Sequence, residues 1–495
     1  MRASVCFVPV LVACAGSGSG GKGGRAPGGI QGGDDSAVAL DCPEAFDRDE
    51  LPSRDAVAAD IATLVEAGPQ AAGDEANERW LAGLEARLVA IPGVTVERVP
   101  VSVPDERVEA GTLVGTWDGV STDVPLQAVL PVPGSVDAPS RYVGPEAAPP
   151  GDMAGKVALI ELQRDGIAVS DLRTALLHES DPRGTLAGQS EYAEGAVLER
   201  PWLLGSTQAQ LDAVVAAGAV GVVLLGDLSA ALAEDLHLGL ELPTVPTVLV
   251  SDDLARRLRD AARVGTGFHA ALDVDAVRGT RTATALRARL GGGTPELVVL
   301  HASSDPLNAV EAGGALALLG VVEALSALQP GCRPRDLLVD LSPGWRTGFA
   351  GASQLGSDLE DQPVAWVGVM AQAGAVEHLP DGAVAQGLVR TGLLEPRFLS
   401  VDGPVGLGAR VIEQTERDAL DRAWVLDRPG GFGAAGTLAG RGHPVVERHS
   451  GPWTLPFADR DETSVDPTDL RSDAAWLGGL FLATGVDTQA ALAPD

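Results

Sequence analysis

The sequence predicts an α/β fold, in which helices flank a mostly parallel sheet. The pattern of apolar residues along the chain carries this prediction. Short segments that are apolar throughout alternate with segments of helical periodicity, and such strands are typical of parallel sheets covered on both faces. The 495 residues are 45% hydrophobic and 21% charged. These are ordinary values for a globular protein, and the length suggests roughly three domains of about 150 residues each.

Helix-start signals mark three of the predicted helices. Ser53 and Asp74 each stand directly before an apolar-periodic segment, so each is expected to cap a helix. Near the end of the chain, Asp466 precedes Pro467 and an early acid, a strong start signal for a last helix.

Apolar runs mark the predicted strands, which are 94–103, 156–162, 220–226, 245–250, 296–301, 336–341 and 363–370. A long apolar helix is predicted at 311–328, and the glycine-rich segment 403–408 is interpreted as a loop. Binding sites in parallel sheets lie at the carboxyl ends of the strands. His301 stands at such an end.

The first fifty residues are predicted to contain a signal sequence and a flexible linker. Residues 1–14 combine an early Arg2 with an apolar stretch and end in Leu-Val-Ala-Cys, which resembles a bacterial lipoprotein signal. The resemblance implies cleavage before Cys14, a lipid on its sulfur, and an extracytoplasmic protein anchored to a bacterial membrane. The alternative is an ordinary secretory signal or a wrongly placed start. Residues 15–50 are predicted to be a flexible linker, since 16–33 contain ten glycines.

Two cysteines remain once Cys6 and Cys14 are assigned to this leader. Cys42 and Cys332 either form a disulfide, as an oxidising compartment allows, or are two unrelated thiols. The formal net charge of −32 excludes nucleic-acid binding through a basic surface.

Several segments occur in an order that resembles the zinc exopeptidases, the family that includes bacterial leucyl aminopeptidases and glutamate carboxypeptidase. They are 60–101, ELVVLHASSD (296–305), DLLVDLSPGWRTGFAGA (336–352), VAWVGVM (364–370) and PFADRDETSVDPTDLR (456–471). The resemblance implies a peptidase-like domain made of two parts, 51–118 and 279–490.

Residues 119–278, between those two parts, resemble the protease-associated domain that is often inserted there. The resemblance lies in GKVALIELQRDG (155–166), AVVAAGAVGVVLLGD (213–227) and VPTVLVSDDLARRL (245–258). It implies an inserted, smaller β-rich α+β domain without catalytic residues, which shapes access or binds partners.

The zinc-exopeptidase resemblance implies a site with two zinc ions, their His and carboxylate ligands, and a Glu that takes a proton from bound water. Only His301 matches, at the first His ligand. Ser303 stands where the family has the Asp that orients this ligand. The bridging Asp falls near Val310 or Glu311, depending on a one-residue gap.

The remaining positions of the motif are replaced. Trp345 stands where the family has its general-base Glu, and Arg346 where it has the adjacent ligand Glu. Val369 replaces the Asp at the end of a strand, and Phe457 the late His. Trp and Val can neither bind zinc nor accept a proton. Arg346 would place a cation beside two dications, at a cost of about 4 kcal/mol for one pair of unit charges at 4 Å and an effective dielectric constant of 20.

Polar residues near the expected rim leave a relocated metal site open: His301, Asp305, Glu311, His443, His449, Asp459 and Asp461. Each also has an ordinary interpretation. Asp305 precedes a proline in a turn, His443 stands in a Gly-His-Pro loop, and Glu311 is an early helix acid favoured by the helix dipole.

The leading hypothesis is therefore a lipid-anchored protein with the zinc-exopeptidase fold that has lost hydrolysis and serves in binding or scaffolding. It assigns no catalytic residue, expects no cofactor, and names as partners the membrane, through the lipid on Cys14, and a peptide or protein ligand. The alternative is an active metallo-exopeptidase, an aminopeptidase or carboxypeptidase, with zinc and relocated ligands. A third hypothesis makes 119–278 a peptide- or glycan-binding module presented by an inert body.

Overall fold

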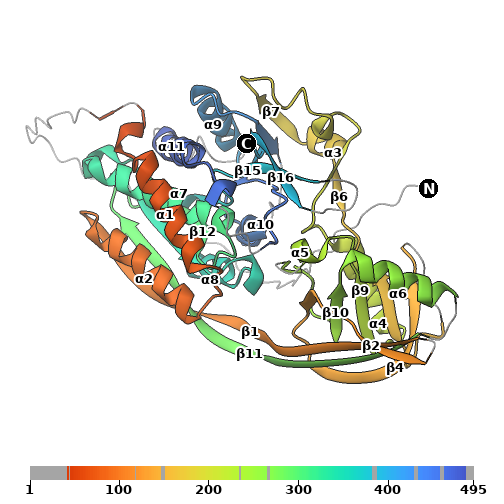
Figure 1. The fold of residues 1–495 in the computed structure, drawn as a ribbon. Coiled ribbons are helices and arrows are strands. Elements are labelled where there is room, and N and C mark those ends of the chain that lie inside the picture. The colour runs from red at the N-terminus through yellow and green to blue at the C-terminus, as the bar shows by residue number, and fades with distance from the viewer. Residues whose placement is uncertain are drawn as a thin grey trace, which may run out of the picture. The chain divides into compact units, whose positions relative to one another are not determined.

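The computed structural model describes residues 42–43, 45–117, 119–145, 151–233, 236–264, 268–381, 387–427, 433–457 and 462–485 (Figure 1). The predicted lipidation site Cys14 lies outside the described residues, as do Asp459, Asp461 and the side chain of Trp345. The stretch Asp41–Asp495 forms one compact unit. We call residues 119–278 the insertion and the rest of the described chain the body.

The body is built on a mostly parallel sheet with helices on both faces, as the sequence predicts. Its strand order is β11-β13-β12-β14-β19-β17-β18-β7. The pairs β13/β12, β12/β14, β14/β19 and β17/β18 are parallel, while β11, β17 and β7 introduce antiparallel contacts. The strand bounds are β11 (His269–Leu290), β12 (Leu297–Ser303), β13 (Asp336–Ser342), β14 (Val364–Met370), β17 (Arg397–Asp402), β18 (Ala423–Asp427) and β19 (Val445–His449).

Two layers of helices bury the apolar faces of this sheet. One face carries α1 (Arg54–Ala67), α2 (Glu75–Ala90), α7 (Ala309–Ala327), α9 (Val405–Arg417) and α11 (Pro467–Thr484). The other face carries α8 (Ala350–Asp358) and α10 (Gly433–Ala439). Short 3-10 helices and a hairpin complete the body: η1 (Arg48–Glu50), η3 (Pro330–Cys332), η4 (Trp345–Thr347), η5 (Glu462–Ser464), β15 (Val376–Pro380) and β16 (Leu388–Leu394).

The helix starts follow from local side-chain chemistry, and the three predicted caps are confirmed. Ser53 accepts a hydrogen bond from the backbone N–H of Ala56, Asp74 from that of Asn77, and Asp466 from those of Thr468 and Asp469.

Helix α7 is a core element. Among the described residues it is the one helix long and apolar enough to cross a bilayer, but 89% of its most apolar window is buried inside the protein. The long apolar helix predicted at 311–328 is therefore confirmed, and it belongs to the core.

Two long antiparallel strands carry the chain from the body to the insertion. The sequence predicts a strand at 94–103, but β1 continues over Val94–Trp117 and pairs with β11 along nearly its whole length, with one irregularity near Val108. At its far end β1 also pairs with the short β2 (Val120–Asp123). Figure 1 shows the two strands running together from α2 to the strands of the insertion.

The insertion extends the same sheet through β4, which pairs with β11. Its strand order is β4-β5-β9-β10-β3. Its elements are β3 (Ala128–Val129), β4 (Gly134–Val143), β5 (Val157–Glu161), α4 (Gly205–Ala216), β9 (Gly221–Leu225), α5 (Ala230–Ala233), β10 (Thr247–Val250) and α6 (Asp252–Val264). The predicted strands 156–162, 220–226 and 245–250 thus correspond to β5, β9 and β10.

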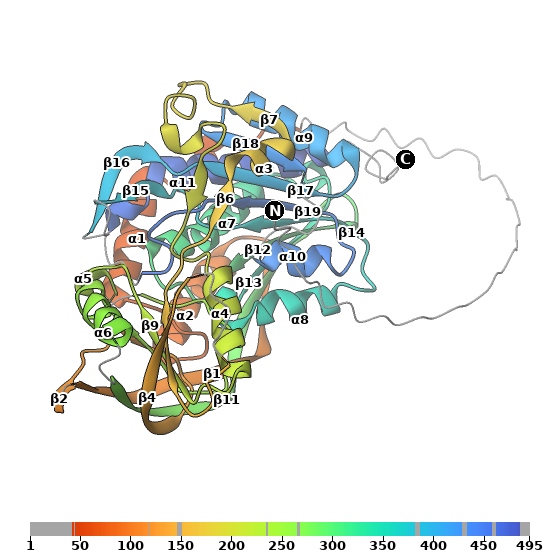
Figure 2. The same cartoon turned by 90° about the vertical axis from the view of Figure 1, so that its right-hand side faces the viewer.

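One segment of the insertion leaves it and packs on the far edge of the body. Residues 166–199 form β6 (Gly166–Ala168), α3 (Val169–Thr174), β7 (Leu176–Ser180), η2 (Ser190–Tyr192) and β8 (Val197–Glu199). Strand β7 pairs with β18 and becomes the edge strand of the body's sheet. Figure 2 shows this segment running from the insertion to β18. Among the described residues, the sheet therefore joins the insertion to the body in two places, through β11 and through β7.

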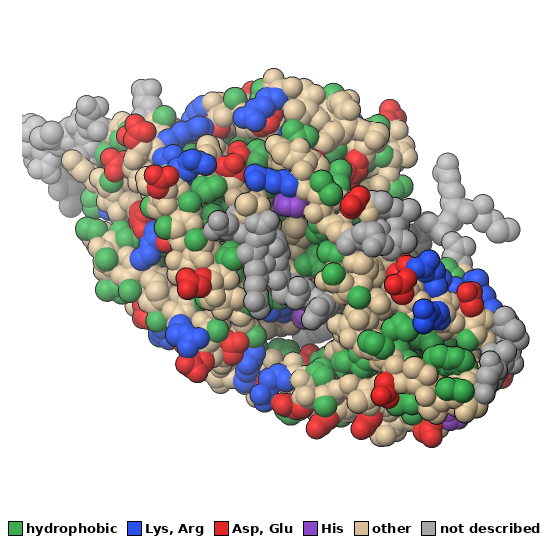
Figure 3. Space-filling model, viewed as in Figure 1, with side chains coloured by type: hydrophobic (Ala, Val, Ile, Leu, Met, Phe, Trp, Pro, Cys, Tyr) green, Lys and Arg blue, Asp and Glu red, His purple; other side chains and the backbone are tan. Residues whose placement is uncertain are grey.

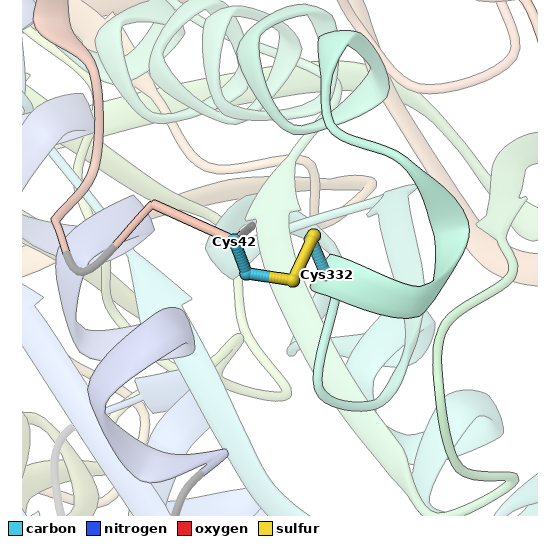
Figure 4. Close-up of a disulfide and its surroundings, with 2 residues drawn as sticks. All are labelled: Cys42 and Cys332. Atoms are coloured by element: carbon cyan, nitrogen blue, oxygen red, sulfur yellow. A yellow bond between two sulfur atoms is a disulfide. The ribbon is translucent and has the colours of Figure 1, made fainter. Parts of the chain in front are cut away.

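Cys42 and Cys332 form a disulfide, which decides between the two alternatives that the sequence leaves open. The bridge ties the chain just before η1 to η3, directly after α7 (Figure 4).

Candidate functional site

A cavity of about 840 Å³ lies between the body and the insertion. The body contributes Ala71, Ala72, Asp305 and Arg346–Phe349, and the strands β1 and β11 contribute side chains that include Arg278 and Arg281. The insertion contributes the segments 128–131 and 236–242. Figure 3 shows the surface hollowed where the molecule passes from the body to the insertion. A cavity of this size can hold a short peptide segment.

Arg346 brings a cation into this cavity. It stands in η4, after β13, and its Nη2 donates hydrogen bonds to the backbone oxygens of Gln70 and Asp305. Its Nε is buried and has no hydrogen-bond partner among the described residues. The guanidinium is therefore held by neutral carbonyl groups and carries a charge that no hydrogen-bonded carboxylate balances within the described chain.

The charge of Arg346 acts on two titratable groups of the cavity, Asp305 and His237. Burial raises the pKa of Asp305 to about 7, against the opposing effects of Arg346 and of the Gly344 N–H that its Oδ1 accepts at 2.7 Å. Burial and the charge of Arg346 lower the pKa of His237 to about 4, so its imidazole is neutral at pH 7. Neither group is a full counter-charge to Arg346 at neutral pH.

His301 lies in a polar row that crosses the sheet, and it is paired with a carboxylate. The parallel register sets it beside Asp340 on β13, and its Nδ1 lies 3.0 Å from Oδ2 of Asp340. Asp340 also accepts hydrogen bonds from Ser342 and Arg287. Burial opposes ionisation of Asp340, but the His301 hydrogen bond and the nearby positive charges outweigh it and lower its pKa. His301 is 1% exposed, as expected for a satisfied strand-end histidine.

The strand positions around His301 hold small or apolar groups. Val369 is the register neighbour of His301 on β14 and packs in the apolar cluster beneath α8 and α10. Ser303 ends β12, and the backbone of Gly344 lies so close that a Cβ there would be 2.2 Å from its Oγ. Glycine at 344 therefore allows the turn into η4 that positions Arg346.

Glu311 and Asn308 organise the start of α7. The Asn308 side chain caps the helix by accepting the Glu311 N–H at 3.0 Å, and the Glu311 carboxylate accepts the N–H of Leu307. This reciprocal arrangement resembles a capping box. The Nδ2 of Asn308 also donates to backbone oxygens in 454–457, including that of Phe457 at 2.8 Å. Glu311 thus serves the helix start, as its ordinary interpretation expects.

Phe457 joins the body to the insertion. It packs among Leu236, Leu238 and Leu240 and forms an isolated bridge with Leu236. The backbone N–H of the adjacent His237 donates to the oxygen of Pro456 at 2.7 Å. This contact forms a wall of the cavity.

The structure separates the remaining rim candidates. His449 lies beside Glu447, with 3.5 Å between Nδ1 and Oε2, and against the ring of Phe398. His443 stands in the loop before β19. Of the described candidates for a relocated metal site, Asp305 is the one that lines the cavity.

Sequence reasoning missed Asp340, His237 and Arg281. Asp340 carries a usable signal, because two parallel strands that end in similar apolar runs place Asp340 level with His301. His237 and Arg281 stand in segments with no motif, and only the tertiary fold brings them to the cavity.

The described residues do not fit a two-zinc centre. They contain no group of three or more His, Cys, Asp or Glu side chains that could hold a metal ion. Among the described residues, the Glu311 carboxylate accepts the N–H of Leu307 at the start of α7, and Arg346 brings a positive charge to the cavity that Asp305 also lines.

Comparisons with solved structures identify the scaffold. The fold is similar to the zinc aminopeptidase from Bacillus subtilis, at a TM-score of 0.60 and 15% identity over 87% of this chain and 95% of that one. It is also similar to a peptidase M28 precursor from Shewanella amazonensis, at 0.61 and 15% over 87% and 93%. A third similar structure is an aminopeptidase from Aneurinibacillus sp. strain AM-1, at 0.57 and 14% over 88% and 93%.

At these identities the likeness shows a shared fold. No family model matches the sequence, and the search of curated proteins finds no match. The fold that the resemblance implies is confirmed by these structures.

Proposed function

We propose that this protein is a non-hydrolytic peptide-binding protein built on the aminopeptidase scaffold, held outside the cytoplasm by a lipid on Cys14. The observation that carries the loss of hydrolysis is the position of Arg346. Its guanidinium lines the cavity and is held by the oxygens of Gln70 and Asp305. A fixed cation there opposes the binding of dications by about 4 kcal/mol for one pair of unit charges at 4 Å.

The cavity supports binding as the retained function. It lies between the body and the insertion, which resembles a protease-associated domain, and its lining combines apolar side chains with charged ones in similar measure. Its apolar side chains can contact the side chains of a peptide, and its charged groups can fix the orientation of that peptide. The disulfide between Cys42 and Cys332 is consistent with an oxidising compartment.

The test of lost hydrolysis measures metal and turnover together. Purified protein lacking residues 1–14 is dialysed against zinc and analysed by mass spectrometry for bound metal. It is then assayed on a panel of aminoacyl-anilides and N-acylated dipeptides. We expect well below one zinc per chain and no release above the buffer rate. About two zinc per chain with chelator-sensitive release would contradict the proposal and support the active metallo-exopeptidase instead.

The anchor has its own test. Full-length protein expressed in a bacterium is expected to partition with membranes and to incorporate labelled palmitate, while Cys14→Ser should not incorporate the label. Palmitate incorporation by Cys14→Ser would contradict lipidation at this residue.

A further inference from the structure

The cavity gathers arginines that lack hydrogen-bonded carboxylates. Arg346, Arg281 and Arg278 all line it. Within the described chain, Arg346 donates only to carbonyl oxygens. The nearest carboxylate oxygen to Arg281 is on Asp105 at 4.0 Å, and the nearest to Arg278 is on Glu106 at 3.9 Å. Both distances exceed that of a hydrogen bond.

This pattern differs from that of the fully buried arginines. Arg397, Arg422 and Arg448 each lie 2.7 Å from a carboxylate oxygen. In a chain with 68 acidic and 36 basic residues, partners for arginine are abundant. Arginines beside a cavity that reach no carboxylate at hydrogen-bond distance therefore have donors available to an external anion.

Arg281 and Arg346 are the two best placed to receive one. Their Nε atoms are buried without a hydrogen-bond partner among the described residues, so part of each guanidinium is already removed from water. A guanidinium in such surroundings gains more from a carboxylate than one in bulk solvent, because its desolvation has already occurred. The Arg278 side chain is more exposed than that of Arg281, at 44% against 26%.

The rest of the cavity lining indicates the chemistry of the ligand next to its anionic group. The insertion contributes Leu236, Leu238, Leu240 and Leu130, and the body contributes Phe349. The nearby His237 is neutral at pH 7 and adds no competing charge. Three acids also line the cavity: Glu106, which lies beside Arg278, Glu241, and Asp305, whose pKa burial raises to about 7. The leucines and Phe349 beside Arg281 and Arg346 suit a short apolar segment that ends in, or contains, a carboxylate.

We propose that the cavity binds the carboxylate of an apolar peptide segment, and that Arg346 and Arg281 receive it. This inference rests on the proposed peptide-binding function and adds the chemical group that is recognised. The carboxylate can be the C-terminus of a peptide or an acidic side chain within it, since both present the same two oxygens to a guanidinium.

The test uses the protein without residues 1–14 and N-terminally labelled peptides, with fluorescence anisotropy at pH 7 as readout. One peptide, Ala-Leu-Ala-Leu, has a free C-terminus, and a second has the same sequence amidated. A third, amidated, carries Glu as its last residue. We expect the amidated neutral peptide to bind at least tenfold more weakly than one of the carboxylate peptides. Tight binding of the peptide with the free C-terminus would identify the C-terminal carboxylate as the recognised group. Tight binding of the amidated peptide with the last Glu would identify an acidic side chain.

Two variants and a control assign the residues. Arg281→Gln removes no side-chain hydrogen bond to another described residue, so the fold of this variant should persist. Arg346→Gln removes the second cation of the proposed site. Both should lose most of the preference for carboxylate. Arg289→Gln, on the same strand β11 but outside the cavity, should keep it. Far-ultraviolet circular dichroism checks that each variant is folded.

Equal binding of the three peptides would overturn this inference and leave the proposed peptide-binding function standing. Retention of the preference in both Arg281→Gln and Arg346→Gln would overturn the residue assignment. Binding of none of the peptides would overturn the inference. Zinc-dependent cleavage of the peptides would instead overturn the proposed function, which this assay detects separately by chromatography of the products.

Discussion

The cluster around Asp473 and the cavity around Arg346 both bring arginines inside the protein, but only the first pairs them with a carboxylate. Oδ1 of Asp473 lies 2.7 Å from Nε of Arg397, and Oδ2 lies 2.7 Å from Nη2 of Arg448. The backbone N–H of Gly374 adds a third donor at 2.9 Å. Burial opposes ionisation of Asp473, but the two arginines outweigh it and lower its pKa.

The difference separates charges that serve the fold from charges that serve a ligand. The Asp473 cluster is sealed between α11 and the sheet, so every lost contact there leaves a buried charge without compensation. The Arg346 region opens on a cavity, so its charge can be compensated by a molecule from outside. Substitutions in the two regions should therefore change the free energy of unfolding by different amounts.

Asp473→Asn should produce the largest effect. The change leaves Arg397 and Arg448 without their shared carboxylate in the interior, and removing one partner of a buried pair typically costs about 3–5 kcal/mol. Urea denaturation followed by tryptophan fluorescence measures the loss. Asp361→Asn, at an exposed position, is the matched control and should change stability by less than about 0.5 kcal/mol. A loss below about 1 kcal/mol for Asp473→Asn would contradict the claim that the Asp473 cluster stabilises the fold.

Glu395 extends the comparison to a buried acid whose oxygens lack partners within the described residues. Burial raises its pKa from 4.5 to about 8, against the opposing charge of Arg200. Because the folded value is the higher one, the stabilisation is present below pH 4.5 and is lost as pH rises towards 8. Wild type should therefore lose roughly 2–3 kcal/mol relative to Glu395→Gln between pH 6 and pH 8, at about 1.4 kcal/mol per pH unit.

The measurement compares urea midpoints of the two proteins across that range. Since other titrating groups are common to both proteins, the difference isolates Glu395. Parallel pH profiles for wild type and Glu395→Gln would show that Glu395 does not carry this dependence.

His301→Ala should cost about 1–3 kcal/mol, because Asp340 loses one buried hydrogen-bond partner but keeps Ser342 and Arg287. We expect no change in zinc content or in peptide affinity, as measured by metal analysis and anisotropy. The half-exposed His269 on β11 offers a control variant, His269→Gln, which should change stability by less than about 1 kcal/mol. Loss of a zinc-dependent activity in His301→Ala would favour the metallopeptidase alternative.

Arg346→Gln should have the smallest effect on stability, less than about 1 kcal/mol. Two hydrogen bonds to carbonyl oxygens are lost, but a charge without a hydrogen-bonded carboxylate is removed as well. The same urea experiment measures it beside Asp473→Asn. A loss as large as that of Asp473→Asn would mean that Arg346 serves the fold in the same way.

Local chemistry made much of the scaffold predictable. The caps at Ser53, Asp74 and Asp466 depend on side chains within three residues of the backbone they satisfy. The apolar strands of the body are recognisable because both of their faces are buried. The α/β class and the order of its elements follow from these signals.

Long-range contacts could not be predicted from the sequence. The pairing of Cys42 with Cys332 spans 290 positions, and β7 joins an edge strand that no local pattern identifies. The loop predicted at 403–408 was wrong, because α9 begins at Val405. Burial of Leu407 and Val411 against the core outweighs the low helix propensity of the glycines.

The candidate site was predicted in part. The resemblance placed Arg346 at a ligand position and Asp305 near the rim of the expected pocket, and the structure has both lining the cavity. His237 and Arg281 reach it from the insertion and from the middle of β11, so their role depends on how the two parts of the fold meet.

The two joins between the insertion and the body constrain how a ligand enters. A hinge-like rotation about β11 would break the ladder between β7 and β18, and a rotation about β7 would bend the paired strands β1 and β11. The bridge between Leu236 and Phe457 and the hydrogen bond from His237 to Pro456 also hold the segment 236–242 against the body. Opening the cavity by moving the insertion is therefore costly. Association should accordingly follow a single exponential without a lag, and a ligand should be selected by its fit to a preformed opening.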